Sequence, residues 1–469
     1  MNKYIVISLI CLSCLLTACG FNRLYERRNN QTASGSAVSS GGISSVNKEI
    51  EKEMQTADYW IGKTVSPDKI LMSGEDITKF NQKITEQLST NPEAGYYNLS
   101  TYGESIDGKL LSDMITRIDF QAKTYYLGEQ PVTANQWKTY YNNRNIEKIG
   151  NFNTISYGII CSRADVRELP TSDEIMSEHG EKGHDVLQNT ALPVNEPVLV
   201  LLTNKDENWY YIIANEYAGW IKKETVGLCE NKAEWEAARQ MKDFLIVTGD
   251  RVQTEENIVE TGKTANGEFT MGTKLALAEE KECKEVFGRE EISHSYVVRI
   301  PVRTEDGKLD YQLSLIPKGR DVHEGYLEYT RANVLRQSFK MLGNQYGWGG
   351  INGYRDCSSM IRDVYLCFGV RLPRNSSAQA MIPGESRLDI SKLSDEEKIQ
   401  KLNSIEPGTI LQMSGHVMIY LGCVEQNYYV ISANGSLVPG YVMLNDLNEK
   451  SPGTDKTWLN RLEIIVGIP

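Results

Sequence analysis

The chain has 469 residues, of which 40% are hydrophobic and 24% are charged, a composition that excludes a disordered chain and indicates a globular protein. Its formal net charge of -12 argues against a nucleic-acid partner, because proteins that bind a phosphate backbone carry clustered Lys and Arg. The same charge disfavours any polyanionic substrate. The length is too great for one ordinary domain, and we expect a multidomain α+β protein.

The N-terminus has the pattern of a secretion signal. Lys3 supplies a positive charge, residues 5–16 are almost continuously apolar, and Leu-Thr-Ala precedes Cys19. The apolar run is too short to cross a bilayer as a stable helix. This ending resembles the bacterial lipobox, which implies a signal peptide over residues 1–18 and a lipid on Cys19 that anchors the protein to a bacterial membrane, outside the cytoplasm. The alternative is an ordinary secretion signal that happens to contain a cysteine.

The next part of the chain divides into a tether and a helical segment. The stretch from Asn30 to Ser45 consists largely of Asn, Gln, Ser, Gly, Thr and Ala, so we expect a flexible tether over residues 19–47. For residues 48–152 we expect a mainly helical N-terminal stabilising domain. Helical spacing is clearest at four apolar positions, Ile77, Phe80, Ile84 and Leu88.

Short apolar runs separated by polar turns predict a small β-barrel over residues 153–229. The runs are residues 198–202, 209–213 and 219–221. Three short sequences resemble a bacterial SH3-like domain: Ala-Asp-Val-Arg at 164–167, Asn-Trp-Tyr at 208–210 and Gly-Trp-Ile at 219–221. The SH3-like resemblance therefore implies a first barrel here.

Similar runs at residues 244–247 and 296–300 predict a second, divergent SH3-like barrel over residues 230–325. Trp209 and Trp220 of the first barrel could contact a glycan, but in small barrels such residues more often belong to the core. We therefore assign both tryptophans to the core.

A cysteine opens a predicted helix in the last third of the chain. Cys357 follows an aromatic, Gly-rich loop at residues 346–350. Apolar residues after it recur on one helical face, at Met360, Ile361, Val364, Tyr365 and Phe368. Unpaired amide donors and the positive end of the helix dipole favour a thiolate there, as a nucleophile requires. The loop lacks the Gly-Lys-Ser/Thr ending of a phosphate-binding loop, so we expect its glycines to bring the backbone close to the nucleophile.

A histidine begins one of several consecutive predicted strands beyond the helix. Apolar runs at residues 408–411, 416–422 and 428–432 predict these strands. The run that follows His416 predicts burial on both faces, hence a rigid backbone that can aim the ring. A thiolate nucleophile needs such a base beside it, so Cys357 and His416 form the candidate catalytic pair.

Four motifs in this order resemble the NlpC-type peptidases. They are Tyr-Gly-Trp-Gly-Gly at 346–350, Asp-Cys-Ser-Ser at 356–359, Leu-Pro-Arg-Asn-Ser at 372–376 and Gly-His-Val-Met-Ile-Tyr-Leu-Gly at 415–422. The resemblance implies a papain-like peptidase domain over residues 326–469, without a cofactor or metal. It also implies a monomeric peptidoglycan hydrolase that cleaves stem peptides between D-glutamate and the following diamino acid.

The resemblance also implies a role for each motif residue. Cys357 would attack the carbonyl, and His416 would take and return the proton. Tyr346 and the Cys357 amide would bind the oxyanion. Five further residues would lie along the peptide-binding cleft: Asp356, Ser358, Trp348, Asn375 and Ser376.

The sequence departs from the family pattern at two places. Asn375 stands where members often carry an Asp that meets a free N-terminal amine. Ser432 stands where members commonly carry a His as the third catalytic residue. A hydroxyl can orient an imidazole but holds no charge to stabilise the imidazolium. Asn434 lies two residues on, on the same face of an extended strand, and is the rival for this role.

Other cysteines and histidines carry no predicted chemistry. No CxxC pair occurs after the predicted signal peptide, so we expect neither a zinc ribbon nor a redox motif, and no disulfide. His179 and His184 are spaced unlike a helical metal pair and sit among charged residues, which favours a solvated loop. Two other functions stay open beside the endopeptidase: an amidase or acyltransferase on the same papain-like core, and a non-catalytic wall-binding lipoprotein.

Overall fold

The computed structural model describes five stretches of the chain: residues 51–255, 267–287, 292–384, 387–437 and 439–469. The predicted signal peptide, the lipidated Cys19 and the tether lie outside the described residues. Within them, no helix is both long and apolar enough to span a membrane.

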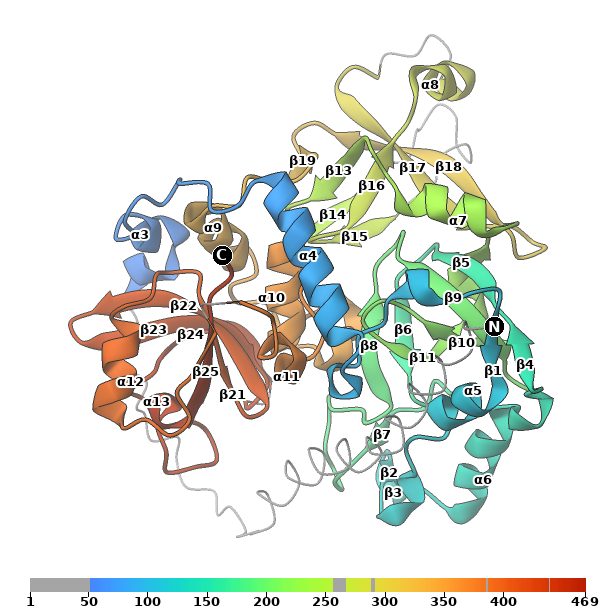
Figure 1. Ribbon diagram of the computed structural model, residues 1–469, viewed down its shortest axis with the longest axis horizontal. Helices are drawn as coiled ribbons and strands as arrows, with labels where there is room; N and C mark the ends of the chain where they lie inside the picture. Colours follow the sequence, from blue (N-terminus) through green and yellow to red (C-terminus); the bar gives the residue numbers. More distant parts are fainter. Residues whose placement is uncertain (1–50, 256–266, 288–291, 385–386, 438) are drawn as a thin grey trace, which may run out of the picture.

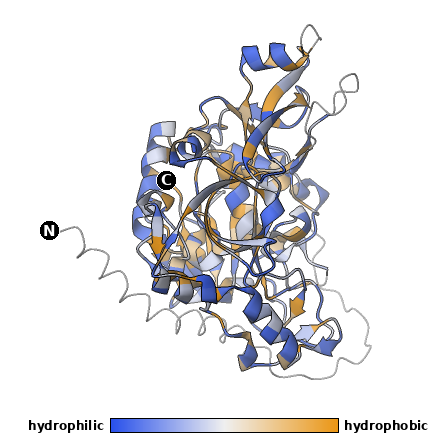
Figure 2. Ribbon diagram, turned by 90° about the vertical axis from the view of Figure 1, so that its right-hand side faces the viewer, coloured by the Kyte–Doolittle hydropathy of each residue, from blue (hydrophilic) through white to orange (hydrophobic). Residues whose placement is uncertain are grey.

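Three large antiparallel sheets organise the described chain (Figure 1). One sheet lies on the right of the figure, a second at the top and a third on the left, with the helices α4 (Gly74–Leu88) and α10 (Cys357–Leu366) in the middle. Hydrophobic residues concentrate on the inner strands, while the outer helices are largely hydrophilic (Figure 2).

The helix α4 forms where the sequence predicted it. Ser73 caps its N-terminus in a capping box with Asp76, which satisfies amide donors that would otherwise have no partner. The four predicted apolar positions are the buried ones, namely Ile77, Phe80, Ile84 and Leu88. This amphipathic stripe attaches α4 to the buried cluster that also contains α10.

The apolar residues of the segment where we expect a mainly helical stabilising domain, residues 48–152, lie in three buried clusters. Trp60 and Phe80 pack into the cluster of the C-terminal domain, Leu111 packs with the first barrel, and Trp137 packs with Leu169. The segment has too few apolar residues in any one stretch to bury a core alone, so it distributes them over three neighbours. Its elements are α3 (Ala57–Ile61), β1 (Ser105–Asp107), α5 (Gly108–Ile115), β2 (Tyr126–Leu127), β3 (Gln130–Pro131), α6 (Ala134–Asn143) and β4 (Phe152–Thr154).

The first large sheet has seven strands in the order β12-β5-β9-β10-β11-β6-β8. The three predicted apolar runs correspond to β9, β10 and β11, and both Trp209 and Trp220 are buried, as predicted. The strand bounds are β5 (Ser156–Ile160), β6 (Ala164–Arg167), β8 (Gln188–Leu192), β9 (Pro197–Thr203), β10 (Trp209–Ile213), β11 (Ala218–Lys222) and β12 (Val226–Leu228). A short strand, β7 (Ile175–Met176), pairs with β2 outside this sheet.

The second large sheet has five strands in the order β18-β17-β16-β13-β19 and its own apolar cluster around Leu245 and Val298. Its strands are β13 (Phe244–Val247), β16 (Lys274–Leu277), β17 (Ser295–Arg303), β18 (Leu309–Pro317) and β19 (Val322–Glu324). Beside them lie the pair β14 (Arg251–Gln253) and β15 (Glu268–Thr270), and the helices α7 (Lys232–Arg239) and α8 (Glu280–Phe287).

The third sheet has six strands in the order β20-β25-β21-β22-β23-β24. Alternate residues of β22 pack on opposite faces: Val417 and Ile419 share a cluster with α10, whereas Met418 and Tyr420 pack with α13. This burial on both faces confirms the prediction from the apolar run. The remaining bounds are α9 (Arg331–Phe339), η8 (Trp348–Gly353), α11 (Ser376–Gln379), β20 (Arg387–Asp389), α12 (Asp395–Leu402), β21 (Ile410–Met413), β22 (His416–Val424), β23 (Asn427–Asn434), β24 (Tyr441–Asp446), α13 (Trp458–Arg461) and β25 (Leu462–Val466).

Candidate active site

The cysteine Cys357 is the first residue of α10 and is 7% exposed. Asp356 caps the helix: its carboxylate accepts from the Ser359 amide at 2.9 Å, and its own amide donates to the Ser359 hydroxyl at 3.0 Å. The capping box fixes the first turn, so the sulfur is held at the positive end of the helix dipole, which stabilises an anion. This position suits a nucleophilic thiolate.

Asp356 and Ser358, which we predicted along the cleft, are hydrogen-bonded within the protein. Arg374 donates to both Asp356 oxygens, at 3.0 and 2.5 Å, and to the Ser358 hydroxyl at 3.0 Å. The amide of Gly349 adds a further bond to the same carboxylate at 3.2 Å. With the Ser359 amide and the Ser358 hydroxyl, these donors fill the acceptor positions of the carboxylate. Asp356 therefore positions the nucleophile's helix.

The charge of Asp356 is maintained despite its burial. Burial by itself raises the pKa of a carboxyl, but the Arg374 guanidinium and the hydrogen bonds from Arg374 and Ser359 outweigh it and hold the pKa of Asp356 below its ordinary value. Arg374 also donates from Nε to the Thr190 hydroxyl of β8, at 2.7 Å. One guanidinium thus joins the cap of α10 to the first barrel.

The Gly-rich loop packs against the first barrel. Gly349 has a φ of 57°, and a Cβ there would lie 2.7 Å from the Gln188 side chain and 2.9 Å from the Gln188 carbonyl oxygen. The Gln188 amide donates to the Gly349 carbonyl at 3.1 Å, and Arg163 donates to the Gly350 carbonyl at 2.5 Å. The close approach that requires glycine is therefore to the barrel, whereas we expected it at the nucleophile.

The two aromatic residues of this loop lie at the junction with the barrel. Trp348 donates from its indole to the Gln188 carbonyl at 3.1 Å, and its ring lies 5.4 Å from that of His184. The Tyr346 ring lies 6.1 Å from the His184 ring and packs over Gly435. His184 lies in a loop, as predicted, but its side chain is only 33% exposed and lies against both aromatic residues. Neighbouring charged residues in the sequence concealed this, and no local signal could have revealed it.

The histidine His416 begins β22, and its Nε2 lies 3.0 Å from the Ser432 hydroxyl on β23. Both side chains are buried, with His416 9% exposed and Ser432 fully covered. The Asn434 side chain is also buried, but its carbonyl oxygen accepts from the Ser436 amide at 2.9 Å. Ser432 is therefore the residue that contacts the imidazole, and the Trp458 ring packs 5.6 Å from it.

The nucleophile and the base belong to one packed core. The helix α10 packs against both β22 and β23. Cys357 shares a buried cluster with Val417, the neighbour of His416, and with Ile431, the neighbour of Ser432. The fold thus brings together elements whose candidate residues are about 60 and 75 positions apart in the chain, as a Cys-His hydrolase requires.

The motif residues Asn375 and Ser376 lie at the start of α11, which packs near α10. Both are half-buried, and the Asn375 side chain makes no capping hydrogen bond to α11. A Cβ added at Gly95 would lie 3.7 Å from the Asn375 amide nitrogen, so the N-terminal segment borders this end of the site. No pattern in the sequence indicated this neighbour.

A buried chain of charges connects the helix of Cys357 to the first barrel and to the second large sheet. Arg355, two residues before Cys357, binds Asp250, which follows β13 of that sheet, and Asp363 of α10, the latter at 3.1 Å. Arg362 binds Asp363 at 3.0 Å and Glu216 of the first barrel at 2.8 Å. Buried charges are expensive unless paired, so these pairs fix how the three sheets meet around α10.

Comparisons with known proteins agree with this geometry. Residues 343–449 match the NlpC/P60 family, and residues 180–222 match the SH3 domain of SH3b1 type. No curated protein matches the chain.

Two solved structures are similar. An NlpC/P60 endopeptidase from Photobacterium damselae subsp. piscicida is 18% identical, with a TM-score of 0.66 over 86% of this chain and 95% of that one. An NlpC/P60 family protein from Bacillus cereus is also 18% identical, with a TM-score of 0.45 over 66% of this chain and 99% of that one.

The C-terminal part of the chain is therefore a papain-like NlpC/P60 peptidase domain, of a family of cell-wall hydrolases, in a multidomain α+β protein with an SH3-like domain. This confirms the resemblance read from the four motifs. The residues that the sequence assigned to catalysis lie inside the matched region: Cys357 begins α10, which packs against the strands of His416 and Ser432.

Proposed function

We propose that this protein is a cysteine endopeptidase that cleaves the γ-D-glutamyl-diamino acid bond of peptidoglycan stem peptides. One observation carries the proposal: a cysteine opens a buried helix that packs against β22 and β23, and these strands carry a histidine and, 3.0 Å from its Nε2, the Ser432 hydroxyl. Such a constellation performs acyl transfer on an amide, because the thiolate attacks the carbonyl and the imidazolium protonates the leaving nitrogen.

The reaction proceeds in two balanced steps. The Cys357 thiolate forms a bond to the γ-carbonyl carbon of D-glutamate, the Cys357 amide and the Tyr346 hydroxyl bind the oxyanion, and the proton on His416 leaves with the amine of the diamino acid. Water, deprotonated by His416, then attacks the thioester and releases the D-glutamate γ-carboxylate and the thiolate. Ser432 orients the imidazole throughout, with no negative charge of its own.

The test uses the full-length chain, purified muropeptides and mass spectrometry of the products. We expect release of a fragment that begins with the diamino acid, abolished by Cys357→Ala. Cys367→Ala is the matched control, because Cys367 caps the other end of α10 and is also buried. Cleavage at a different amide would instead support the amidase alternative. A folded chain that cleaves no stem but is retained by sacculi would replace the endopeptidase with the wall-binding function.

We also propose that a lipid on Cys19 anchors the enzyme to a bacterial membrane, facing the cell envelope. The support is the apolar run that ends in Leu-Thr-Ala-Cys. In cells fed labelled fatty acid, we expect label in the wild-type chain and none in Cys19→Ala, which should leave the membrane fraction. Label that persists in the variant would contradict the anchor.

A further inference from the structure

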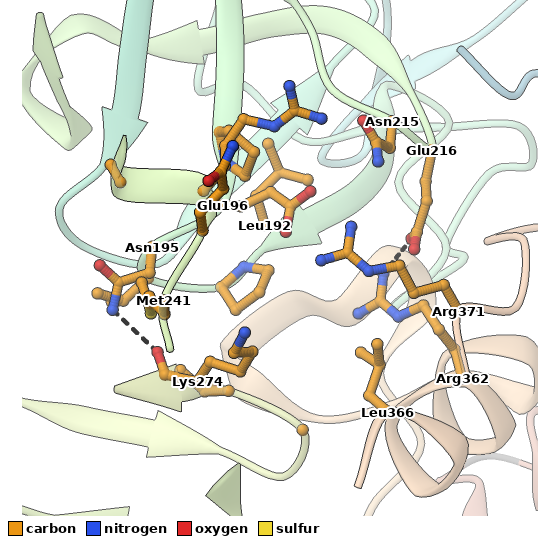
Figure 3. A pocket seen from close by; sticks show the side chains of 18 of the residues that line it. Leu192, Asn195, Glu196, Asn215, Glu216, Met241, Lys274, Arg362, Leu366 and Arg371 are labelled. Atoms are coloured by element: carbon orange, nitrogen blue, oxygen red, sulfur yellow. Dashed lines mark hydrogen bonds and ion pairs between the residues drawn. The ribbon is translucent and has the colours of Figure 1, made fainter. Parts of the chain in front are cut away.

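A cavity of about 360 Å³ lies where the two barrels, the N-terminal segment and the far half of α10 meet (Figure 3). The catalytic residues take no part in its lining. Its wall on the peptidase side comes from Arg362, Leu366 and Arg371. Leu366 is nine residues beyond Cys357, so it lies about 13 Å further along the helix axis. The cavity is thus separate from the site described above.

Some charges in the cavity wall are neutralised by the protein. Arg362 pairs with Glu216 at 2.8 Å, as the dashed line in Figure 3 marks. Arg239 pairs with Glu236 one turn away on α7, at 3.1 Å. These four residues form two complete ion pairs and add no net charge to the cavity.

Three other charged side chains form no ion pair within the described residues, although Glu196 and Arg371 attract each other electrostatically. Glu196, Lys274 and Arg371 come from the first barrel, the second barrel and the peptidase domain, and their side chains extend into the cavity (Figure 3). Within the described residues, neither the carboxylate of Glu196 nor the guanidinium of Arg371 has a hydrogen bond or ion pair of its own. Burial and the charge of Arg371 lower the pKa of Lys274 to about 8, and the Lys274 ammonium lies 4.0 Å from the centre of the Phe244 ring.

Polar acceptors in the wall are also unpaired. The side-chain oxygens of Asn195 and Asn215 are buried and make no hydrogen bond within the described part of the chain. Because unpaired buried polar groups cost free energy, a cavity that holds two cations, one anion and two acceptors is suited to a charged, hydrogen-bonding occupant. Its volume lies in the range of small-molecule sites.

We propose that this cavity binds a small compound with one ammonium and two carboxylates, the ammonium on Glu196 and the carboxylates on Arg371 and Lys274. A dipeptide that ends in D-glutamate has this set of charges. It is the amino-side product of the proposed cleavage, and this identification rests on the proposed function. A second groove of about 350 Å³ shares Tyr96, Asn215 and Arg371 with the cavity and opens beside α4, which provides an entrance.

The test is calorimetric titration of the full-length chain with alanyl-D-glutamate. We expect binding that weakens at least about tenfold in Arg371→Met and in Glu196→Gln, since each removes a charge-assisted contact. Alanyl-alanine, which has one carboxylate, and glutarate, which has no amine, should each bind at least about tenfold more weakly than the dipeptide. Lys274→Met should weaken binding, whereas Lys242→Met, an exposed lysine outside the lining, should not.

Controls separate this cavity from the catalytic cleft. Cys357→Ala and His416→Gln should bind the dipeptide as the wild type does, and the unfolding temperatures of the cavity variants should match it. Absent binding, or binding that survives both Arg371→Met and Glu196→Gln, overturns the inference. Muropeptide cleavage is measured on the same preparations, so failure of the proposed function appears as absent cleavage with the cavity still occupied.

Discussion

The nucleophile side and the base side of the active site are built with different chemistry. On the nucleophile side, a buried carboxylate and guanidinium, Asp356 and Arg374, hold the start of α10 through several charge-assisted bonds. On the base side, His416 has a neutral partner, Ser432, at 3.0 Å. The protein therefore places the buried negative charge of Asp356 in support of the helix that carries Cys357, and it gives the imidazole a neutral hydroxyl as a hydrogen-bond partner.

This difference indicates that the stability of the nucleophile side depends on electrostatic interactions more than that of the base side does. Removing one member of a buried ion pair leaves an uncompensated charge, which is costly, whereas removing a neutral hydrogen bond costs much less. Substitutions on the nucleophile side should thus lower the free energy of unfolding, whereas substitutions on the base side should mainly lower kcat. Four predictions test this contrast, in order of decreasing expected effect.

The strongest effect should come from the base itself. His416→Gln should lower kcat for muropeptide cleavage at least about a thousandfold, because the proton transfer to the leaving amine is lost. His184→Gln is the matched control, since His184 lies at the barrel junction beside Trp348. We expect its kcat to change by less than about tenfold. Equal losses in the two variants would contradict the assignment of the base.

The next effect should appear in stability. Arg374→Met should lower the free energy of unfolding by about 3 to 5 kcal/mol, because Asp356 is left buried without its cation. Arg336→Met removes an exposed pair with Asp68 at 3.8 Å and should cost less than about 1 kcal/mol. Urea unfolding of both variants checks this. A cost for Arg374→Met as small as that of the control would refute the role given to the ion pair.

Ser432→Ala should act mainly on catalysis. The variant leaves the imidazole without its buried partner, and kcat should fall by about 10- to 100-fold, equivalent to the ~1 to 3 kcal/mol of a lost buried hydrogen bond. Ser432→Thr keeps the hydroxyl and should retain most activity. Asn434→Ala should change kcat less than Ser432→Ala does, because the Asn434 oxygen bonds Ser436. The reverse ranking in steady-state kinetics would make Asn434 the third residue.

The smallest effect should be on how the free energy of unfolding changes at acidic pH. The folded-state pKa of Asp356 is depressed, so its stabilising contribution is complete above the ordinary carboxyl pKa and is lost as pH falls through the lower folded value. Unfolding free energies measured from neutral pH downward should therefore decline more steeply in the wild type than in Asp356→Asn. Parallel curves for the two proteins would show that Asp356 titrates normally.

Much of the site could be predicted from local sequence patterns. Apolar residues spaced at about 3.6 residues predicted α4 and the buried face of α10. The apolar run after His416 predicted a strand that is buried on both faces. The order of four short motifs identified the peptidase domain. These features depend on residues close together in the chain, where periodicity and helix capping act.

The sequence by itself thus determined the elements and the chemistry of Cys357 and His416. Only the tertiary structure decided that Arg374 binds Asp356, that Ser432 rather than Asn434 meets the imidazole, and that His184 reaches Trp348. It also decided that residues 51–140 distribute their apolar side chains among three cores. The physical reason is that ion pairs, side-chain direction at a strand end and the burial of a short segment depend on neighbours that local periodicity does not encode.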